Sequence, residues 1–245
     1  MLKKLELTSA IYQRVLICLV PRFADVVDMQ RIYFTTFLLA TLLSGCATIE
    51  YSDYKKKGEE RPLFSRDVYF EVTNKFYQKP PDCVAFLPIK SRGHRLVNQY
   101  VEQSAARNFY GKVKTVIGPL KRSKIARHLA LDLKRNQDRQ IFSKKTACHH
   151  FIQPTLSSLD QSFVLFWSSK SLEIELVMHG VNEEEIFWRA AHSNKRSDGG
   201  FPTSPISVGT AIFKASQAHN DRETMPSMVD DALRRMMATL PDTRY

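Results

Sequence analysis

The sequence predicts an α/β fold of the α+β kind, with a three-layer-like β-α-β-α-β parallel core, an antiparallel hairpin that extends this core and a closing C-terminal helix. Three observations lead to this prediction. Apolar runs alternate with helical periodicity between residues 83 and 156, β-rich segments follow to residue 192, and an amphipathic stripe ends the chain.

The parallel core is predicted from three apolar strands and the two helices between them. Residues 83–89 form a continuous apolar run, which is typical of a strand buried on both faces. Residues 96–109 repeat apolar side chains at spacings of three and four, as a helix does, and residues 113–117 indicate a second strand. A second helix is expected to begin with Ser123 as its N-cap. After a polar connection, residues 147–156 complete the unit as a third strand.

The hairpin and the last helix follow this core. Residues 172–178 alternate between apolar and acidic or polar side chains, and residues 186–192 return as a second strand, so the hairpin has one wet face. Residues 193–205 are rich in Gly, Pro and Ser and predict a loop. Residues 206–218 fit either a strand or a helix, with a slight preference for helix. Residues 227–240 predict an amphipathic helix.

The composition indicates a folded and strongly basic protein. The chain has 245 residues, of which 43% are hydrophobic and 25% charged, which excludes collagen-like, low-complexity and disordered classes. The formal net charge is +11, and residues 46–245 keep 31 of the 36 basic and 22 of the 25 acidic residues, a net charge of +9. Such a domain is expected to attract anions, and the cellular compartment decides which ones.

The segment from Met29 has the organisation of an export signal. Arg31 supplies a positive charge, residues 32–43 are apolar, and small residues follow, so residues 29–45 predict a signal peptide. The apolar stretch is too short for a transmembrane helix, which needs about 20 residues. Residues 1–28 contain three acidic residues and do not fit a leader, so we expect an N-terminal extension or a true start at Met29.

Leu43-Ser44-Gly45-Cys46 resembles the lipobox of bacterial lipoproteins. The resemblance implies that a diacylglycerol is attached to Cys46 and that cleavage occurs just before it. Ala47, rather than Asp, implies sorting to the outer membrane, with the folded part on its periplasmic face in a Gram-negative envelope. Two or three acyl chains on one residue anchor a protein firmly. The alternative is that Cys46 is a buried structural cysteine at the end of a core helix.

The domain organisation follows from this leader. Residues 46–64 are expected to be a flexible tether, because residues 51–61 are polar, charged and without apolar periodicity. Residues 65–245 are expected to be a single α/β periplasmic domain. Its first element, residues 65–77, places three apolar side chains on one helical face and predicts a short docking helix.

The predicted order of elements resembles the TolB amino-terminal and CsgG-like lipoprotein domains. Phe86-Leu87-Pro88 in the first core strand and Phe187-Trp188 in the hairpin carry the likeness. The resemblance covers most of the predicted domain. It implies a non-enzymatic accessory protein of the cell envelope whose sheet and loops contact other proteins.

Two cysteines remain in the predicted domain once Cys46 is lipidated. Cys83 and Cys148 both lie at the N-terminal ends of predicted parallel strands. Neighbouring strands lie about 5 Å apart, so adjacent first and third strands would suit a disulfide in an oxidising periplasm. Two buried free thiols are the alternative.

No metal site, cofactor site or catalytic arrangement is predicted. His149 and His150 lie beside Cys148, but neighbouring residues on a strand point to opposite faces and cannot bind one ion together. The sequence holds no HEXXH motif, no Gly-X-Ser-X-Gly motif and no phosphate-binding glycine loop. We therefore expect a protein that is not an enzyme.

The strongest candidate interaction surface is the basic stretch of residues 121–139. Its cations are either a solvated helix face or a patch for acidic protein, phospholipid or lipopolysaccharide. The export signal disfavours nucleic acid. We expect a lipid-anchored accessory protein that contacts envelope proteins in assembly, secretion or transport, with a lipid- or glycan-binding carrier module as the alternative. The candidate patch consists of Arg122, Lys124, Arg127, Lys134 and Arg135.

Overall fold

The computed structural model describes residues 49–58, 67–91, 95–164, 167–199 and 223–245. The chain divides into two units between Thr48 and Ile49, and the described residues all belong to the second unit. The predicted signal peptide, Cys46 and the ambiguous segment 206–218 lie outside the described residues.

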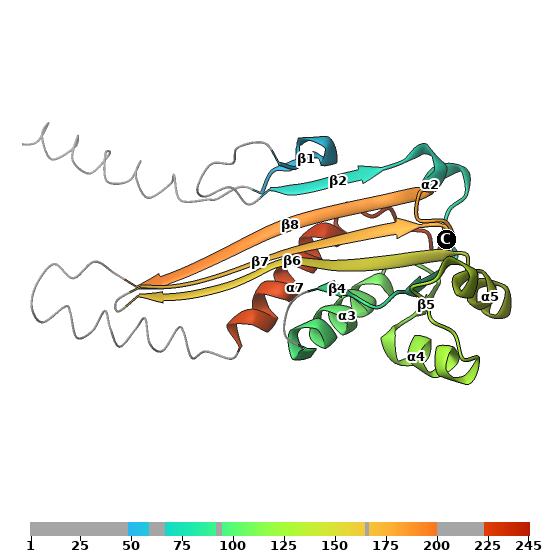
Figure 1. Cartoon of the computed structure of the whole chain (residues 1–245). Coiled ribbons are helices and arrows are strands. Elements are labelled where there is room, and N and C mark those ends of the chain that lie inside the picture. Colours follow the sequence, from blue (N-terminus) through green and yellow to red (C-terminus); the bar gives the residue numbers. More distant parts are fainter. Residues whose placement is uncertain (1–48, 59–66, 92–94, 165–166, 200–222) are drawn as a thin grey trace, which may run out of the picture. The chain divides into compact units, whose positions relative to one another are not determined.

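A mixed eight-stranded sheet organises the folded unit, and the predicted α+β class is confirmed (Figure 1). Seven strands follow the order β1-β2-β8-β7-β6-β3-β5, and the short strand β4 pairs with β6. The strands on this path are β1 (Tyr51–Asp53), β2 (Val68–Val72), β3 (Cys83–Phe86), β5 (Thr115–Ile117), β6 (His150–Val164), β7 (Trp167–His179) and β8 (Ile186–Gly199), and β4 is Lys90–Ser91.

The predicted parallel core is present at one end of the sheet. Strand β3 pairs in parallel with both β5 and β6, so the first and third predicted strands are neighbours. Helix α3 (Arg95–Phe109) connects β3 to β5, as expected. Two helices, α4 (Pro119–His128) and α5 (Asn136–Thr146), connect β5 to β6. The expected polar connection therefore contains helix α5. The sequence did not predict this helix because it has few apolar side chains.

Helix α4 also begins earlier than expected. Gly118 is its N-cap residue and Pro119 occupies the first turn, so Ser123 lies inside the helix and caps nothing. Proline suits the first helical turn because its missing N–H has no partner there in any case. This start corrects the prediction from Ser123.

Alternate residues of β3 and of the position after it face two different apolar cores, which explains the layers. Val84 and Phe86 pack with α3 and the C-terminal helix α7 (Thr224–Met237). Ala85 and Leu87 pack instead with residues of α4, α5 and β6. Successive side chains of a strand point to opposite faces, so this end of the sheet is covered on both sides. The three-layer arrangement is confirmed here.

The antiparallel part is more extensive than the predicted hairpin. Strands β6, β7 and β8 form a continuous three-stranded meander that extends beyond the helices (Figure 1). The loop expected at residues 193–205 is wrong for residues 193–199. These residues continue β8, which stays paired with β7 up to the pair of Gly199 and Trp167. Polar side chains such as Ser193, Lys195 and Ser197 hid the strand, whose pairing comes from backbone hydrogen bonds.

The N-terminal segments correct two predictions. The expected helix over residues 65–77 is strand β2 followed by the short helix α2 (Asn74–Gln78), because the β-branched and aromatic run of β2 pairs with β8. The expected flexible tether contains β1, which pairs in parallel with β2, and the 3-10 helix η1 (Tyr54–Lys56). The folded unit therefore begins before residue 65.

The closing helix is confirmed as α7. Its apolar stripe includes Met228, Val229, Leu233 and Met236, all buried in the larger core. Trp188 of β8 lies in the same core, where its ring meets Phe109 edge-on at 5.9 Å between centroids. Helix α7 thus covers the antiparallel meander and also contacts α3.

Candidate functional site

Cys83 and Cys148 form a disulfide at the start of the parallel core. Their sulfur atoms are 2.11 Å apart and their Cα atoms 5.2 Å apart. The pairing of Val84 with His150 in strands β3 and β6 brings the two cysteines side by side. Cys148 is fully buried. The other predicted modification site, Cys46, lies outside the described residues.

The predicted basic patch separates into buried and exposed cations. Arg122 does not belong to a surface patch, because its side chain is buried and its Nη2 lies 3.2 Å from Oε2 of Glu102. The other oxygen of Glu102 accepts a 2.7 Å hydrogen bond from the backbone N–H of Ile89. This pair joins α4 to α3 and to the segment after β3. The exposed members are Lys124, Arg127, Lys134 and Arg135.

A second buried arginine escaped the sequence prediction. Arg139 of α5 donates to the carbonyl oxygens of Leu133 and Lys134 and pairs with Glu183 at 3.2 Å. Its role is to satisfy backbone acceptors at the turn before α5. No short motif distinguishes Arg139 from its exposed neighbours, because its partners depend on the tertiary fold.

A polar cluster covers the face of the meander opposite α7. Tyr54 of η1 donates a hydrogen bond to Glu175 of β7, and Lys57 pairs with the same carboxylate at 2.8 Å. The guanidinium of Arg189 lies over the Tyr54 ring at 4.0 Å and pairs with Glu71 of β2 at 2.6 Å. Burial and the hydrogen bond to Glu175 raise the pKa of Tyr54. The cluster fastens η1 to the sheet.

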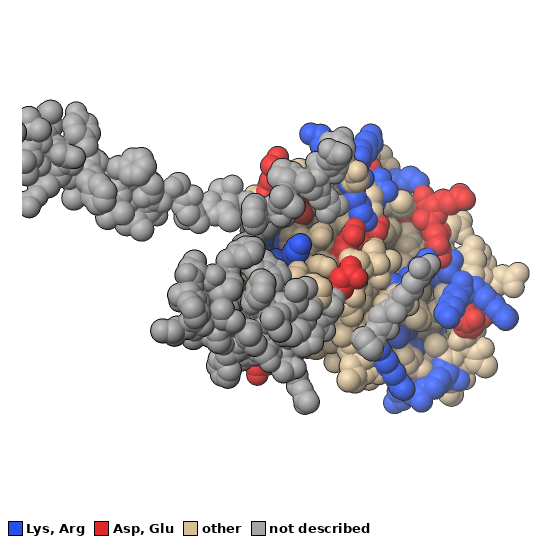
Figure 2. Space-filling model, turned by 60° about the vertical axis from the view of Figure 1, so that its left-hand side comes forward, with Lys and Arg blue, Asp and Glu red and all other residues tan. Residues whose placement is uncertain are grey.

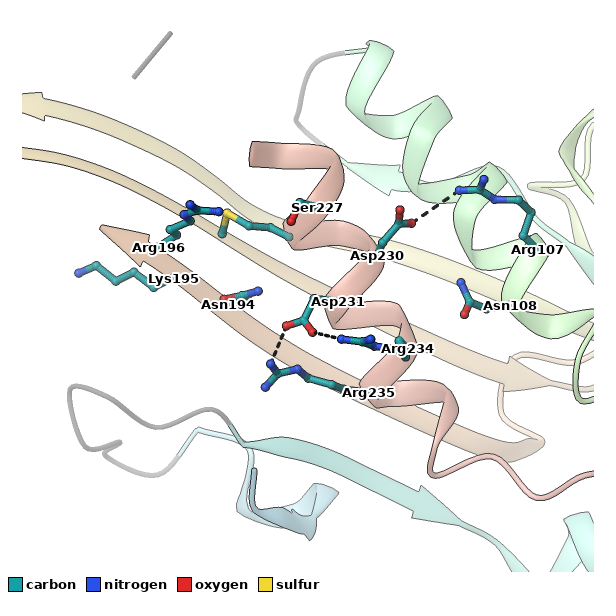
Figure 3. A pocket seen from close by; sticks show the side chains of 11 residues that line it. Arg107, Asn108, Asn194, Lys195, Arg196, Ser227, Asp230, Asp231, Arg234 and Arg235 are labelled. Atoms are coloured by element: carbon teal, nitrogen blue, oxygen red, sulfur yellow. Dashed lines mark hydrogen bonds and ion pairs between the residues drawn. The ribbon is translucent and has the colours of Figure 1, made fainter. Parts of the chain in front are cut away.

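A charged groove of about 850 Å³ lies between α3, α7 and the extended end of β8 (Figure 3). Its cations come from three elements and outnumber its acids. They are Arg107 of α3, Lys195 and Arg196 of β8, and Arg234 and Arg235 of α7, against the carboxylates of Asp230 and Asp231.

The two acids of the groove are held by internal ion pairs. Asp231 lies 2.8 Å from Arg234 and 2.7 Å from Arg235. Burial raises the pKa of Asp231, but the hydrogen bonds from these two arginines lower it more, so the net shift is downward. Asp230 accepts a 2.7 Å hydrogen bond from Tyr100 and lies 3.6 Å from Arg107. The groove therefore keeps an excess of positive charge.

An apolar pocket of about 270 Å³ lies between the first turns of α3 and α7. Leu96, Val97 and Tyr100 line it from α3, and Met225 and Val229 line it from α7. It shares no lining residue with the charged groove, although Tyr100 bonds to Asp230 of the groove.

The buried histidines have structural surroundings. His150 packs edge-on against Phe187 with centroids 4.6 Å apart, and burial lowers its pKa to about 4. His179 and His192 each bond through Nδ1 to a backbone carbonyl oxygen, and burial lowers the pKa of both. Nδ1 of His149 forms a hydrogen bond with the hydroxyl of Ser143. Within the described ranges, no group of three or more His, Cys, Asp or Glu residues is placed to hold a metal ion.

The surface carries both signs of charge. On the face shown in Figure 2, Lys and Arg side chains are interspersed with Asp and Glu. Among the helices that the structure describes, none is long and apolar enough to cross a membrane.

Comparison with known proteins gives remote structural likenesses. No family model and no curated protein matches the sequence. The solved PelC dodecamer from Paraburkholderia phytofirmans matches 72% of this chain and 97% of its own at 12% identity, with a TM-score of 0.45. Lipoprotein GNA1162 from Neisseria meningitidis matches 54% of this chain and 94% of its own at 9% identity, with a TM-score of 0.38. At these scores the likenesses carry no argument about function.

Proposed function

We propose that this chain is a lipid-anchored accessory protein on the periplasmic face of a Gram-negative outer membrane, acting through protein contacts in envelope assembly, secretion or transport. The observation that supports the proposal is Leu43-Ser44-Gly45-Cys46 directly after a short apolar leader. The role requires no catalytic step and no cofactor.

The position of β1 makes the proposed anchor a short one. Tyr51, the first residue of β1, is the fifth residue after Cys46. An extended chain spans at most about 3.6 Å per residue, so these five residues reach about 18 Å. A lipid on Cys46 would hold the folded unit next to the bilayer. Partners of this unit would then be envelope components within a few nanometres of the membrane.

The cysteine pair supports an oxidising compartment. Disulfides persist in the periplasm and are rare in the bacterial cytosol, where thiols are kept reduced. The bonded geometry of Cys83 and Cys148 suits export of the domain. In the periplasm this basic protein would not meet the nucleic acids of the cytosol.

The test of the anchor is Cys46→Ser in the full-length chain, with Cys18→Ser as the matched control. Cys46→Ser is expected to abolish incorporation of radiolabelled palmitate and to release the protein from the membrane fraction, whereas Cys18→Ser keeps both. Label and membrane fractionation that are unchanged in Cys46→Ser would refute the proposal. Replacement of Met29 by Ala shows which start is used: loss of the protein identifies Met29 as the start, because cleavage before Cys46 gives the same mature chain from either start.

A second candidate function is a carrier module that binds an anionic lipid or glycan in the charged groove. Its excess of cations favours this candidate, as do the buried Nε and Nη1 atoms of Arg235, which lack acceptors among the described residues. Mass spectrometry of the purified protein is expected to find a bound lipid or glycan that is lost in Arg234→Glu. The matched control is Arg127→Glu, outside the groove, which is expected to keep it. Identical extracts from Arg234→Glu and the wild type would exclude the carrier role of this groove.

A further inference from the structure

We infer that the shallow pocket between α3 and the start of α4 docks an acidic segment of a partner protein, which inserts one apolar side chain. The inference rests on the proposed function only in taking the partner to be a protein of the envelope. The pocket measures about 270 Å³ and shares one lining residue, Arg107, with the charged groove. All of its lining residues belong to the described part of the chain.

Two large apolar side chains at this pocket do not join the core. Leu120 is 79% exposed and Tyr110 is 57% exposed, and both line the pocket. Tyr110 directly follows the buried Phe109, and Leu120 lies in the first turn of α4, so neither side chain belongs to a chain terminus. Exposed apolar groups that border a hollow are typical of protein interaction sites. An apolar side chain placed between them would be removed from water on several sides.

Small residues form the floor of the pocket. A Cβ atom at Gly118 would lie 3.4 Å from Cβ of Ala106 and 3.9 Å from the hydroxyl of Tyr110. Gly118 and Ala106 therefore allow the start of α4 to approach α3 closely. The hydroxyl of Tyr110 donates a 3.3 Å hydrogen bond to the carbonyl oxygen of Val116, which holds the ring in place. The pocket is formed before any partner binds, which lowers the entropic cost of binding.

Two cations line the pocket, and no acidic side chain does. Arg107 and Lys121 are lining residues, and Lys124 is exposed one turn further along α4. No side chain caps the first turn of α4, so the backbone N–H groups of Leu120 and Lys121 have no side-chain acceptor beside the lining cations. The charge complement of this surface is a carboxylate-rich segment. An apolar contact within a charged rim is also the usual arrangement of an interaction hot spot.

The sheet order favours a protein over the anchoring bilayer as the occupant. Strand β1, next to the proposed anchor, lies at one edge of the sheet, and β5, which leads into α4, lies at the other. Six strand spacings of about 4.8 Å separate these edges by about 29 Å. The pocket is therefore remote from the point at which the chain would meet the membrane.

The test uses defined peptides and the full chain solubilised in detergent micelles. The probe is a fluorescent seven-residue peptide with one central Phe between two blocks of three Asp or Glu residues. Its matched control replaces Phe by Ala. Fluorescence anisotropy is expected to show binding of the Phe peptide, and about tenfold weaker binding of the Ala peptide, as loss of one hot-spot side chain produces.

Variants of the protein locate the binding. Leu120→Ala and Lys121→Glu are each expected to weaken binding of the Phe peptide about tenfold. Tyr77→Ala and Lys144→Glu alter an exposed aromatic residue on α2 and an exposed lysine on α5, and they are expected to keep binding within about twofold. Circular dichroism checks that each variant is folded.

Three outcomes would overturn the inference. Equal binding of the Phe and Ala peptides would mean general attraction to a basic protein, and unchanged binding by Leu120→Ala would place the peptide elsewhere. If Leu120→Ala and Lys121→Glu weaken binding to phosphatidylglycerol vesicles but not to the peptide, the surface contacts a membrane instead. Cys46→Ser is expected to bind the peptide normally, so failure of the anchor proposal is distinguishable from failure of this one.

Discussion

The two ends of the sheet exclude water in different ways. At the parallel end, β3, β5 and the start of β6 have helices on both faces and a disulfide at their base. In the meander of β6, β7 and β8, helix α7 covers one face, and the polar cluster around Tyr54 covers part of the other. The parallel end is closed by apolar packing, whereas the outer face of the meander is closed by paired charges.

The two regions differ in how far their stability depends on single contacts. Apolar packing on two faces distributes stability over many residues, and buried ion pairs such as Arg122 with Glu102 complete it. The meander depends on its single apolar face, with the polar cluster as a supplement. The changes below test this contrast, beginning with the largest expected effect.

Trp188→Ala removes the largest fully buried side chain of the meander. We expect a loss of about 3–5 kcal/mol in the free energy of unfolding, because the change leaves a cavity in the core and removes the ring contact with Phe109. Urea denaturation followed by circular dichroism measures it. The control Tyr77→Ala, at an exposed aromatic residue, should cost far less. Equal effects of the two changes would contradict the importance assigned to the inner face.

The double replacement Cys83→Ala with Cys148→Ala removes the crosslink of the parallel end. The expected loss is about 2–4 kcal/mol, since the disulfide closes a long loop with a sequence separation of 65 residues. Reduction of the wild type should lower its urea midpoint by a similar amount and leave the double variant unchanged. Two freely alkylated thiols in denatured protein taken from the periplasm would show that the pair is not oxidised.

Arg122→Met leaves the buried carboxylate of Glu102 without its charged partner. We expect a loss of about 2–3 kcal/mol in unfolding free energy, because an unpaired buried charge is costly. Arg127→Met, on the same helix but exposed, is expected to change stability by less than about 0.5 kcal/mol. Comparable urea midpoints for the two variants would mean that Arg122 is only a surface cation.

Acidification is expected to destabilise the parallel end through His150. Burial, followed by the charges of Lys79 and His149, lowers the pKa of His150 to about 4. The unfolded chain therefore binds the proton first, so stability is complete above about pH 6.5 and falls as the pH approaches 4, by about 2–3 kcal/mol. His150→Gln should reduce this loss between urea titrations at pH 7 and pH 4.5. The exposed control His128→Gln should not.

Tyr54→Phe tests the polar cluster and is expected to have the smallest effect. Loss of the hydrogen bond to Glu175 should cost about 1–2 kcal/mol near neutral pH. Because the pKa of Tyr54 is raised, only the unfolded chain ionises this tyrosine above about pH 10, and the wild type then loses its advantage over the variant. Equal unfolding free energies at pH 7 would mean that η1 does not depend on this contact.

Apolar patterning predicted the elements that pack into the apolar cores. Strand β3, helix α3 and helix α7 were predicted close to their observed bounds, whereas the adjacency of the strands after Cys83 and Cys148 was only a condition for the disulfide until the structure showed it. The two helices repeat apolar side chains at helical spacing and β3 is a continuous apolar run, so each signal is local in the sequence.

The missed features depend on partners distant in sequence. Tyr54 and Glu175 are 121 residues apart, and nothing near Tyr54 indicates that its segment is a strand edge and a turn rather than a tether. The basic stretch likewise gives no local sign that Arg122 is buried while Lys124 is exposed. The same sequence positions would fit a continuous surface patch, and only the packing of α4 against α3 separates them.

The polar cluster that fastens η1 to the sheet has a mechanical consequence. With a lipid on Cys46, tension from the bilayer would enter the fold through β1 at the sheet edge. Lys57 and Tyr54 would pass this load to β7 through Glu175, and Arg189 would share it with β2 through Glu71. The helices α3 and α4 lie outside this path. A pull on the anchor would therefore strain the edge of the sheet and leave the far side of the molecule undeformed.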